Sequence, residues 1–288
     1  MSGKNKKRTV RRDEAVDALR TIWWFQCLST HLETNTPREV QRAIAPHTVA
    51  LDINGEPIKN NKFLGYSKGR HVPSKALQRQ AEAILPKSSW ILSHPIWLVL
   101  KSTGSIKDQA VEWIRQLDRE VQSIVLQPYN EVVIGASRHT LGALERRASL
   151  DSLAALTILL KLHHEDNQPE LVWLYAQSIF RVMLLIGTSL DRNNVAGRMF
   201  QLYVERVFSL AVFEGKRMDL SNYDYVFAAN HLAGIADRVR DKHASERDRR
   251  MPTFYALQAL TGIYQQRFKK YFQIPLVAIT NLQKDSHK

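Results

Sequence analysis

The chain has 288 residues, of which 44% are hydrophobic, 24% charged and 9% aromatic. This apolar share excludes an intrinsically disordered chain, and 12 Gly and 10 Pro exclude a collagen-like one. The single cysteine, Cys27, excludes an intrachain disulfide and a zinc site built from cysteines. The length predicts one large domain or two ordinary ones.

Basic residues outnumber acidic ones, 41 to 28, and most of the excess lies near the N-terminus. Residues 1–100 hold 16 Lys or Arg and 8 Asp or Glu, a net charge of +8, whereas residues 101–288 have a net charge of +5. A field of one sign over a small region attracts polyanions, so the charge favours a nucleic-acid partner, with solubility alone as the alternative.

The N-terminal segment indicates an expected compartment. Its first twelve residues hold six Lys or Arg and no acid, and no apolar stretch follows to form a secretory signal. Asp13, Glu14 and Asp17 come next, which disfavours an organelle transit peptide, and no window of 18 apolar residues occurs. We therefore expect a cytoplasmic protein that does not contact a membrane.

Helical signals follow in chain order through the first hundred residues. A helix is predicted over Asp13–His31, and a second begins at the N-cap Thr36, with Pro37 and Glu39 in its first turn, and ends near Pro46. Residues 47–61 are expected to be irregular, with a turn at Asn54-Gly55. Further helices are predicted at Lys62–Ser67 and Pro73–Leu85. The apolar stripe of the first helix is expected to contain Ala15, Leu19, Ile22, Trp23, Gln26 and Cys27.

The rest of the chain has the same helical period. The segment KSTGSIK, residues 101–107, resembles a linker, and only Glu131–Gly135 suggests a strand. The helix over 169–188 is apolar nearly all round, which predicts a central position. We expect an all-α fold with a flexible basic arm (1–12), a helix-turn-helix-like region (13–100) and a larger multi-helix bundle (101–288). The helices predicted beyond the linker are 106–126, 138–164, 169–188, 193–214, 221–243 and 253–272.

Enzyme signatures are scarce in this sequence. It contains no dinucleotide or phosphate loop, no G-x-S-x-G and no H-E-x-x-H, and Cys27 lies on an apolar stripe that favours an inert thiol. The run His163-His164-Glu165-Asp166 could bind a metal, but adjacent helical histidines point about 100° apart and suit the end of a helix. The sequence predicts no metal and no cofactor, and it favours a non-enzyme.

One alternative function involves RNA. The spacing of Arg238 and His243 resembles the Arg-x(4–6)-His motif of HEPN-type toxin ribonucleases, although Val239 stands where that family favours a polar residue. This resemblance implies a helical effector that acts on RNA or on a protein partner. A solvent-exposed helix face is the alternative interpretation, because residues 237–250 contain both basic and acidic side chains.

A second resemblance covers residues 63–85, FLGYSKGRHVPSKALQRQAEAIL. Phe63 and Tyr66 form an apolar pair, Gly69 suits the left-handed residue that ends a helix, and Pro73-Ser74 suits the start of the next. The segment resembles the second half of a phage Cro/repressor-type helix-turn-helix domain. The family joins its second and third helices by a turn of three or four residues, whereas about fifteen separate Pro46 from Lys62 here.

This resemblance implies a DNA-binding transcription regulator that recognises double-stranded DNA. We further expect the C-terminal helical domain to form a homodimer or to bind a partner. The start of the recognition helix would reach the edges of the nucleotide bases, and the basic residues that follow it would contact phosphates. The N-terminal arm would follow the phosphate backbone or a minor groove. The candidate base-edge residues are Asn60, Asn61 and Lys62. The candidate phosphate contacts near the helix are Lys68, Arg70, His71, Ser74 and Lys75, and those of the arm are Lys4, Lys6, Lys7, Arg8, Arg11 and Arg12.

Overall fold

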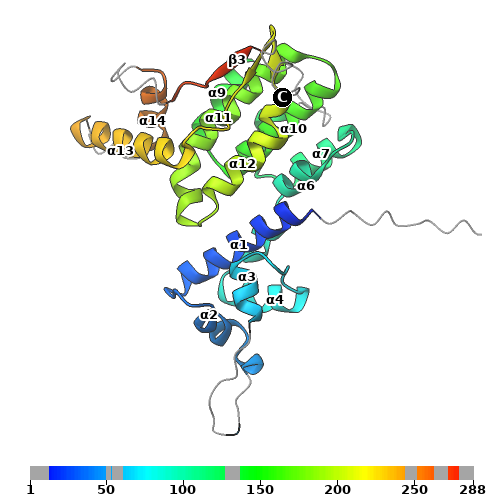
Figure 1. The fold of residues 1–288 in the computed structure, drawn as a ribbon, viewed down its shortest axis with the longest axis vertical. Coiled ribbons are helices and arrows are strands. Elements are labelled where there is room, and N and C mark those ends of the chain that lie inside the picture. The colour runs from blue at the N-terminus through cyan, green and yellow to red at the C-terminus, as the bar shows by residue number, and fades with distance from the viewer. Residues whose placement is uncertain are drawn as a thin grey trace, which may run out of the picture. The chain divides into compact units, whose positions relative to one another are not determined.

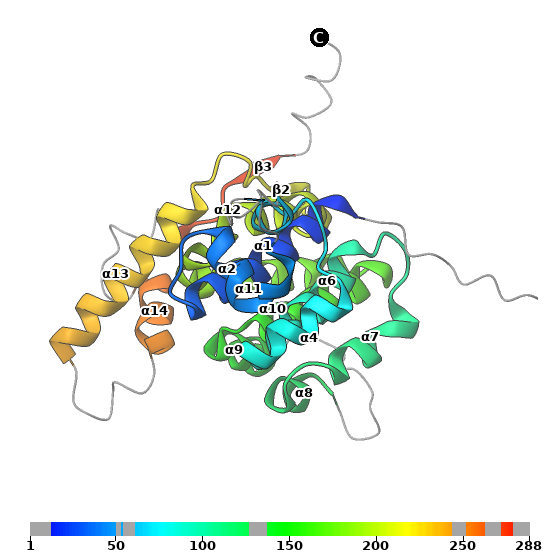
Figure 2. The same cartoon turned by 90° about the horizontal axis from the view of Figure 1, so that it is seen from below.

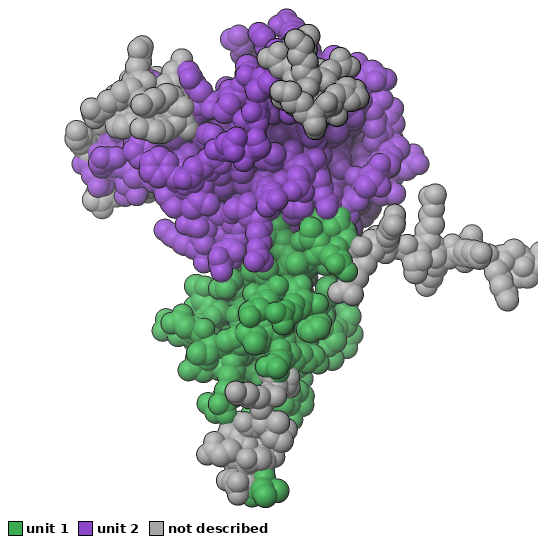
Figure 3. All heavy atoms as spheres, viewed as in Figure 1, with its two compact units in different colours: residues 1–92 green, residues 93–288 purple. Residues whose placement is uncertain are grey.

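The structure, a computed structural model, describes residues 13–49, 53, 61–126, 137–243, 252–262 and 272–278. It is predominantly α-helical, which confirms the predicted fold class. The chain divides into two compact units, residues 1–92 and 93–288, which are coloured separately in Figure 3. The boundary predicted from the sequence was near residue 100.

Unit 1 is built from helices (Figure 1). The four predicted helices are present with bounds within two residues of the predicted ones, whereas the 3-10 turn after the second and the last helix were not predicted. The elements of unit 1 are α1 (Glu14–His31), α2 (Pro37–Ile44), the 3-10 turn η1 (Pro46–Thr48), α3 (Lys62–Ser67), α4 (Lys75–Ile84) and α5 (Ser88–Ser93), whose last residue belongs to unit 2.

Side-chain caps fix where three of these helices begin. Asp13 Oδ1 accepts a hydrogen bond from the Val16 amide at 3.2 Å and starts α1. Thr36 and Ser74 start α2 and α4 in the same way, each accepting from an amide at 3.3 Å. Such caps satisfy amides that lack a partner within the helix. Pro73 therefore precedes the cap of α4, rather than lying in its first turn as predicted.

Helices α1, α2, α3 and α4 of unit 1 share one apolar core. On α1 the buried side is centred on Trp24, Phe25 and Leu28. The predicted stripe was partly wrong, because Ala15 is exposed and Gln26 and Cys27 are only half-buried. The shared core anchors α3 firmly enough to orient its outer side. Its other buried members are Val40, Ile44, Ala45, Phe63, Tyr66, Leu77, Ala81 and Leu92.

Unit 2 contains the longest helix of the described residues, α11, and three short strands. Figures 1 and 2 show α13 and α14 side by side, and their residues contact one another. The helices are α6 (Pro95–Lys101), α7 (Lys107–Arg115), α8 (Arg119–Val125), α9 (Arg138–Arg147), α10 (Leu150–Glu165), α11 (Pro169–Arg192), α12 (Ala196–Arg206), α13 (Tyr225–His243) and α14 (Pro252–Leu260). The 3-10 turn η2 (Phe208–Leu210) and strands β1 (Val212–Phe213), β2 (Lys216–Met218) and β3 (Leu276–Ala278) complete the unit.

The strands form an antiparallel sheet in the order β1-β2-β3. The turn between β1 and β2 consists of Glu214 and Gly215, whose φ angles are 49° and 68°. Two positive φ angles suit the tight turn of a two-residue hairpin. The helix predicted over 193–214 was therefore wrong beyond Arg206, since the chain turns into this hairpin.

Two other long predicted helices are broken. The predicted helix 106–126 is interrupted at Asp118, which caps α8 and accepts a hydrogen bond from Arg147 at 2.8 Å. The predicted helix 138–164 is interrupted at Ala148, which has a φ of 39°. The last predicted helix, 253–272, ends at Leu260. Each break shortens a helix that the periodicity alone would continue.

Helix α11 occupies the centre of unit 2, as its sequence predicted. It contacts α9, α10, α12, α13, α14 and β1. At Gly187 the backbone of α11 lies so close to α13 that an added Cβ would stand 2.3 Å from the Cβ of Ala229. By length and composition α11 is the one helix within the described residues that could cross a membrane, and most of its apolar window is buried inside the protein.

The segment predicted as a linker, residues 101–107, is a turn fixed within unit 2. Lys161 Nζ donates to the Ser102 carbonyl at 2.7 Å, and Glu165 accepts from Ser105 Oγ at 2.6 Å and from the Ile106 amide at 2.7 Å. The linker interpretation was wrong, because these bonds tie the turn to the end of α10. The small polar residues of this segment form a docked turn.

Candidate nucleic-acid interface

The short helix α3 has one buried side and one exposed side. Phe63 and Tyr66, three residues apart, are 2% and 1% exposed and pack edge to face at a ring-centroid distance of 5.4 Å. Tyr66 makes a second edge-to-face contact with Trp24 of α1 at 5.9 Å. Because these rings anchor one side of the helix, Asn61 and Lys62 at its start face solvent.

The end of α3 is fixed by a Schellman motif at Gly69. The Arg70 amide donates to the Gly65 carbonyl at 2.8 Å and the Gly69 amide to the Tyr66 carbonyl at 3.0 Å. Gly69 has a φ of +69°, and an added Cβ would lie 2.6 Å from the Ala18 carbonyl oxygen of α1. Glycine is required here both for its backbone conformation and for the close approach to α1.

We call the turn at Gly69, between α3 and α4, the Gly69 corner. Basic side chains lie on both sides of it. Lys68 and Arg70 flank Gly69 and are exposed, and Ser74 and Lys75 are exposed at the start of α4. No acidic residue occurs between residues 61 and 81. We call this surface the α3–α4 face and define it as the exposed residues Asn61, Lys62, Lys68, Arg70, His71, Ser74, Lys75 and Arg79.

The start of α4 brings a cation close to a helix N-terminus. Lys75 Nζ donates to Gln78 Oε1 at 3.3 Å, and Gln78 Nε2 donates to the Pro73 carbonyl at 2.8 Å. Gln78 is buried where the helix-turn-helix family usually has a leucine, and this bond explains how the polar side chain fits. A helix N-terminus beside a lysine is a favourable place for an anion.

Three exposed basic residues of unit 1 were not among the sequence candidates, and one of them, Arg79, belongs to the α3–α4 face. Arg79 lies one turn after Lys75, so the two cations project from the same side of α4. Arg38 and Arg42 are exposed on α2. Within the described residues Lys68, Arg70 and Arg79 form no ion pair. The four-residue spacing of Lys75 and Arg79 was the signal that could have identified Arg79.

Two acidic residues of unit 1, Glu82 and Glu39, are bonded to their own turns. Glu82 accepts hydrogen bonds from the amides of Lys87 at 2.6 Å and Ser89 at 2.8 Å, which lowers the pKa of its carboxyl group. Glu39 accepts from the hydroxyl of Thr36 at 2.7 Å and from Thr34, and these bonds lower its pKa too. Both carboxylates therefore stay charged near neutral pH while bonded to their own turns, and neither pairs with the bases of the α3–α4 face.

Helices α2 and α3 pack against each other, as a helix-turn-helix pair would. The connection between them runs from Ala45 to Asn61, much longer than the three- or four-residue turn of that family. Several sequence candidates fall outside the described residues. These are Lys4, Lys6, Lys7, Arg8, Arg11, Arg12, Asn60, the Asn54-Gly55 turn, the Glu131–Gly135 strand and the side chain of His243.

The other candidate groups of the sequence have structural roles. Burial raises the pKa of the Cys27 thiol to about 11, so the reactive thiolate is scarce near neutral pH. His163 stacks on Tyr175 at 5.2 Å and contacts Gln168 Oε1 through Nδ1 at 2.7 Å. Asp166 pairs with Lys107 at 2.5 Å, beside the bonds that Glu165 makes to the 101–107 turn. The members of this run therefore hold the end of α10.

Two buried titratable groups of unit 2 also have local structural explanations. Burial lowers the pKa of Lys161 to about 8, and its ammonium group donates to the Val99 and Ser102 carbonyls at 2.7 Å each. Burial likewise lowers the pKa of His94, whose Nδ1 accepts from the Ile96 amide at 3.1 Å and caps α6. Strong pKa shifts often mark functional sites, but these two groups terminate helix α6.

Comparison with known proteins identifies no relative of this chain. No protein-family model, no curated protein and no solved structure matches it. The interpretation of the α3–α4 face therefore depends on its geometry and charge alone.

Proposed function

We propose that unit 1 binds double-stranded DNA through the α3–α4 face and that the protein acts as a cytoplasmic transcription regulator. The observation that supports this proposal is a run of exposed basic residues, with no acidic residue in the sequence from 61 to 81, around a helix whose opposite side is fixed in the core by Phe63 and Tyr66. A helix anchored in this way can present its outer side to the major groove without rearrangement. The homodimer expected from the sequence stays a prediction.

The proposed roles follow from position. Asn61 and Lys62, at the start of α3, would contact base edges, since Asn can bond adenine and Lys can bond guanine. Lys68, Arg70, Lys75 and Arg79 would contact phosphates, which fix the position of the helix on the duplex. The N-terminus of α4 at Ser74 would add backbone amides for one phosphate. These roles assign specificity to α3 and affinity to the corner and α4.

We expect the full chain to bind duplex DNA with a strong salt dependence. Several phosphate contacts give a slope of about −4 or steeper for log affinity against log salt. Deleting residues 1–12 should weaken binding to all sequences by a similar factor, because the cations of this segment would contact phosphates and not nucleotide bases. Fluorescence anisotropy with labelled duplexes at several salt concentrations measures both. An affinity that does not change with salt concentration, or tighter binding to single-stranded RNA than to duplex DNA, contradicts the proposal.

Base recognition is tested at the start of α3. Once a preferred site has been selected from random duplexes, Asn61→Ala or Lys62→Ala should cost about 1–3 kcal/mol on that site and less on random DNA. Lys216→Ala, at an exposed position of β2 in unit 2, is the control and should leave both affinities unchanged. Circular dichroism checks that each variant is folded. If both α3 variants discriminate between sites as the wild type does, α3 is not the recognition helix.

A further inference from the structure

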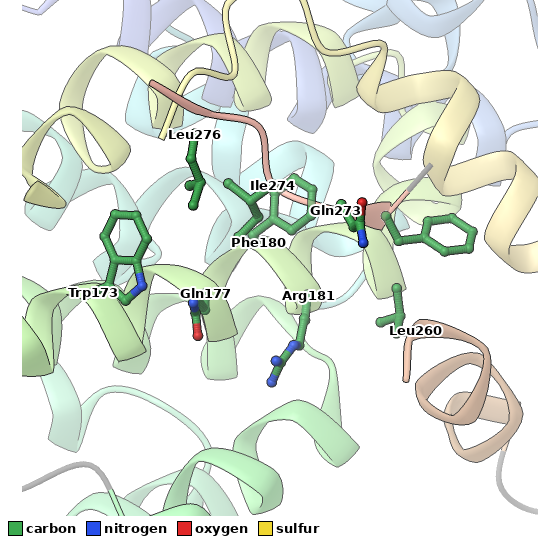
Figure 4. A pocket seen from close by; sticks show the side chains of 9 residues that line it. Trp173, Gln177, Phe180, Arg181, Leu260, Gln273, Ile274 and Leu276 are labelled. Atoms are coloured by element: carbon green, nitrogen blue, oxygen red, sulfur yellow. The ribbon is translucent and has the colours of Figure 1, made fainter. Parts of the chain in front are cut away.

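A cavity of about 400 Å³ opens in unit 2 between α11 and the segment that enters β3 (Figure 4). This volume lies at the small end of the range of small-molecule sites. Figure 4 shows Trp173, Gln177 and Arg181 in a row along α11, with Ile274 and Leu276 on the segment that crosses that helix. The remaining lining residues are Phe180, Leu260, Phe272 and Gln273.

The row on α11 follows from sequence spacing. Trp173, Gln177 and Arg181 are separated by four residues each, so they share one side of the helix. The Trp173 ring lies 6.4 Å from the ring of Phe213 in β1, which supports it from the side. Leu276, across the cavity, is 49% exposed. The cavity therefore combines an indole, an amide and a guanidinium group with an apolar wall.

Arg181 is held in place by a buried carboxylate. Its Nη1 donates to Glu145 Oε1 at 3.1 Å, and Ser178 Oγ donates to the same oxygen at 2.6 Å. Glu145, on α9, is 8% exposed, whereas the side chain of Arg181 is 49% exposed. Within the described part of the chain, Glu145 is the only hydrogen-bond partner of this guanidinium group. Most of the five N–H donors of Arg181 therefore remain for a ligand.

The chemistry of this arrangement selects a class of ligand. The guanidinium group of Arg181 is held by Glu145. Its planar geometry matches that of a carboxylate, which it can bind through two parallel hydrogen bonds. Its charge is already shared with Glu145, so a monoanion fits better than a phosphate dianion. The indole of Trp173 and the side chains of Phe180 and Ile274 provide apolar surface for a flat ring. We propose that this cavity binds a small aromatic carboxylate.

Calorimetric titration of the full chain tests this proposal with defined probes. Indole-3-acetate and 4-hydroxybenzoate should bind with a dissociation constant of about 1 mM or lower, the range for ligands of this size. Their primary amides should bind at least about ten-fold more weakly, because they cannot form the charged pair with Arg181. The proposal is overturned if neither acid binds, or if the amides bind as tightly as the acids.

Variants on α11 locate the binding site. Arg181→Gln should weaken binding of the acids about ten-fold or more, whereas Arg192→Gln, at an exposed position of the same helix, should not change it. Because Arg181→Gln leaves buried Glu145 without its cation, indole NMR of the wild-type chain provides a measurement independent of folding. Addition of indole-3-acetate should shift the Trp173 N–H signal, assigned with Trp173→Phe. An unshifted Trp173 signal, or full affinity in Arg181→Gln, overturns the proposal.

Discussion

Replacing Gly69 with alanine should lower the free energy of unfolding of unit 1 by about 2–5 kcal/mol. A left-handed backbone costs a residue with a Cβ about 1–2 kcal/mol, and overpacking adds about 1–3 kcal/mol. The added Cβ would lie 2.6 Å from the Ala18 carbonyl oxygen and 2.7 Å from its Cα. Both are backbone atoms of α1, so relief requires a shift of α1 or of the whole corner. Urea unfolding and amide hydrogen exchange of α1, α3 and α4 measure the loss.

Gly65→Ala is the matched control for this prediction. An added Cβ at Gly65 would lie 2.5 Å from Cδ2 of His71, an exposed ring that can rotate away. Alanine is also the better helix former, by about 1 kcal/mol, and Gly65 lies within α3. The stability of Gly65→Ala should therefore stay within about 1 kcal/mol of the wild type. Equal losses in the two variants would show that strain at Gly69 is not what fixes the corner.

The Gly69 corner was predictable because its signals are local. A glycine after a short apolar pair, followed by Pro73-Ser74, specifies a helix end and a helix start within a few residues. Thr36 is a local signal of the same kind, and its predicted role as the cap of α2 is confirmed. Asp13, which was predicted to lie within the first helix, is the cap of α1. The side of α3 that faces the core was equally predictable from the sequence, since Phe63 and Tyr66 are the apolar pair in that helix.

The features that the sequence did not reveal depend on distant partners. The break at Asp118 is fixed by Arg147, and the docked turn at residues 101–107 is fixed by Lys161 and Glu165 of α10. Without a proline at Asp118, periodicity continued the first helix, and the small polar residues of 101–107 favoured a linker. The cavity beside α11 was missed for the same reason. Its walls come from segments about a hundred residues apart, and only the fold brings them together.

Removing four cations from the α3–α4 face should almost abolish DNA binding. Each phosphate contact contributes about 0.9 to the slope of log affinity against log salt. Four contacts contribute about 3.6, and at about 0.15 M salt that amounts to an approximately 10³-fold loss of affinity. The variant carries Lys68→Gln, Arg70→Gln, Lys75→Gln and Arg79→Gln. All four side chains are exposed and none of them forms an ion pair within the described residues, so the fold should survive.

A change of net charge alone would also weaken DNA binding, and a control with the same charge loss separates the two effects. Four exposed arginines of unit 2 provide that control, changed together to glutamine: Arg115, Arg119, Arg192 and Arg198. Cations that do not contact a phosphate contribute only screened attraction at physiological salt, so under the proposal the control should lose far less affinity and keep the wild-type slope. Anisotropy titrations across a series of salt concentrations give both quantities. If the two variants lose affinity equally, the protein attracts DNA through its overall charge, and the α3–α4 face is not the binding surface.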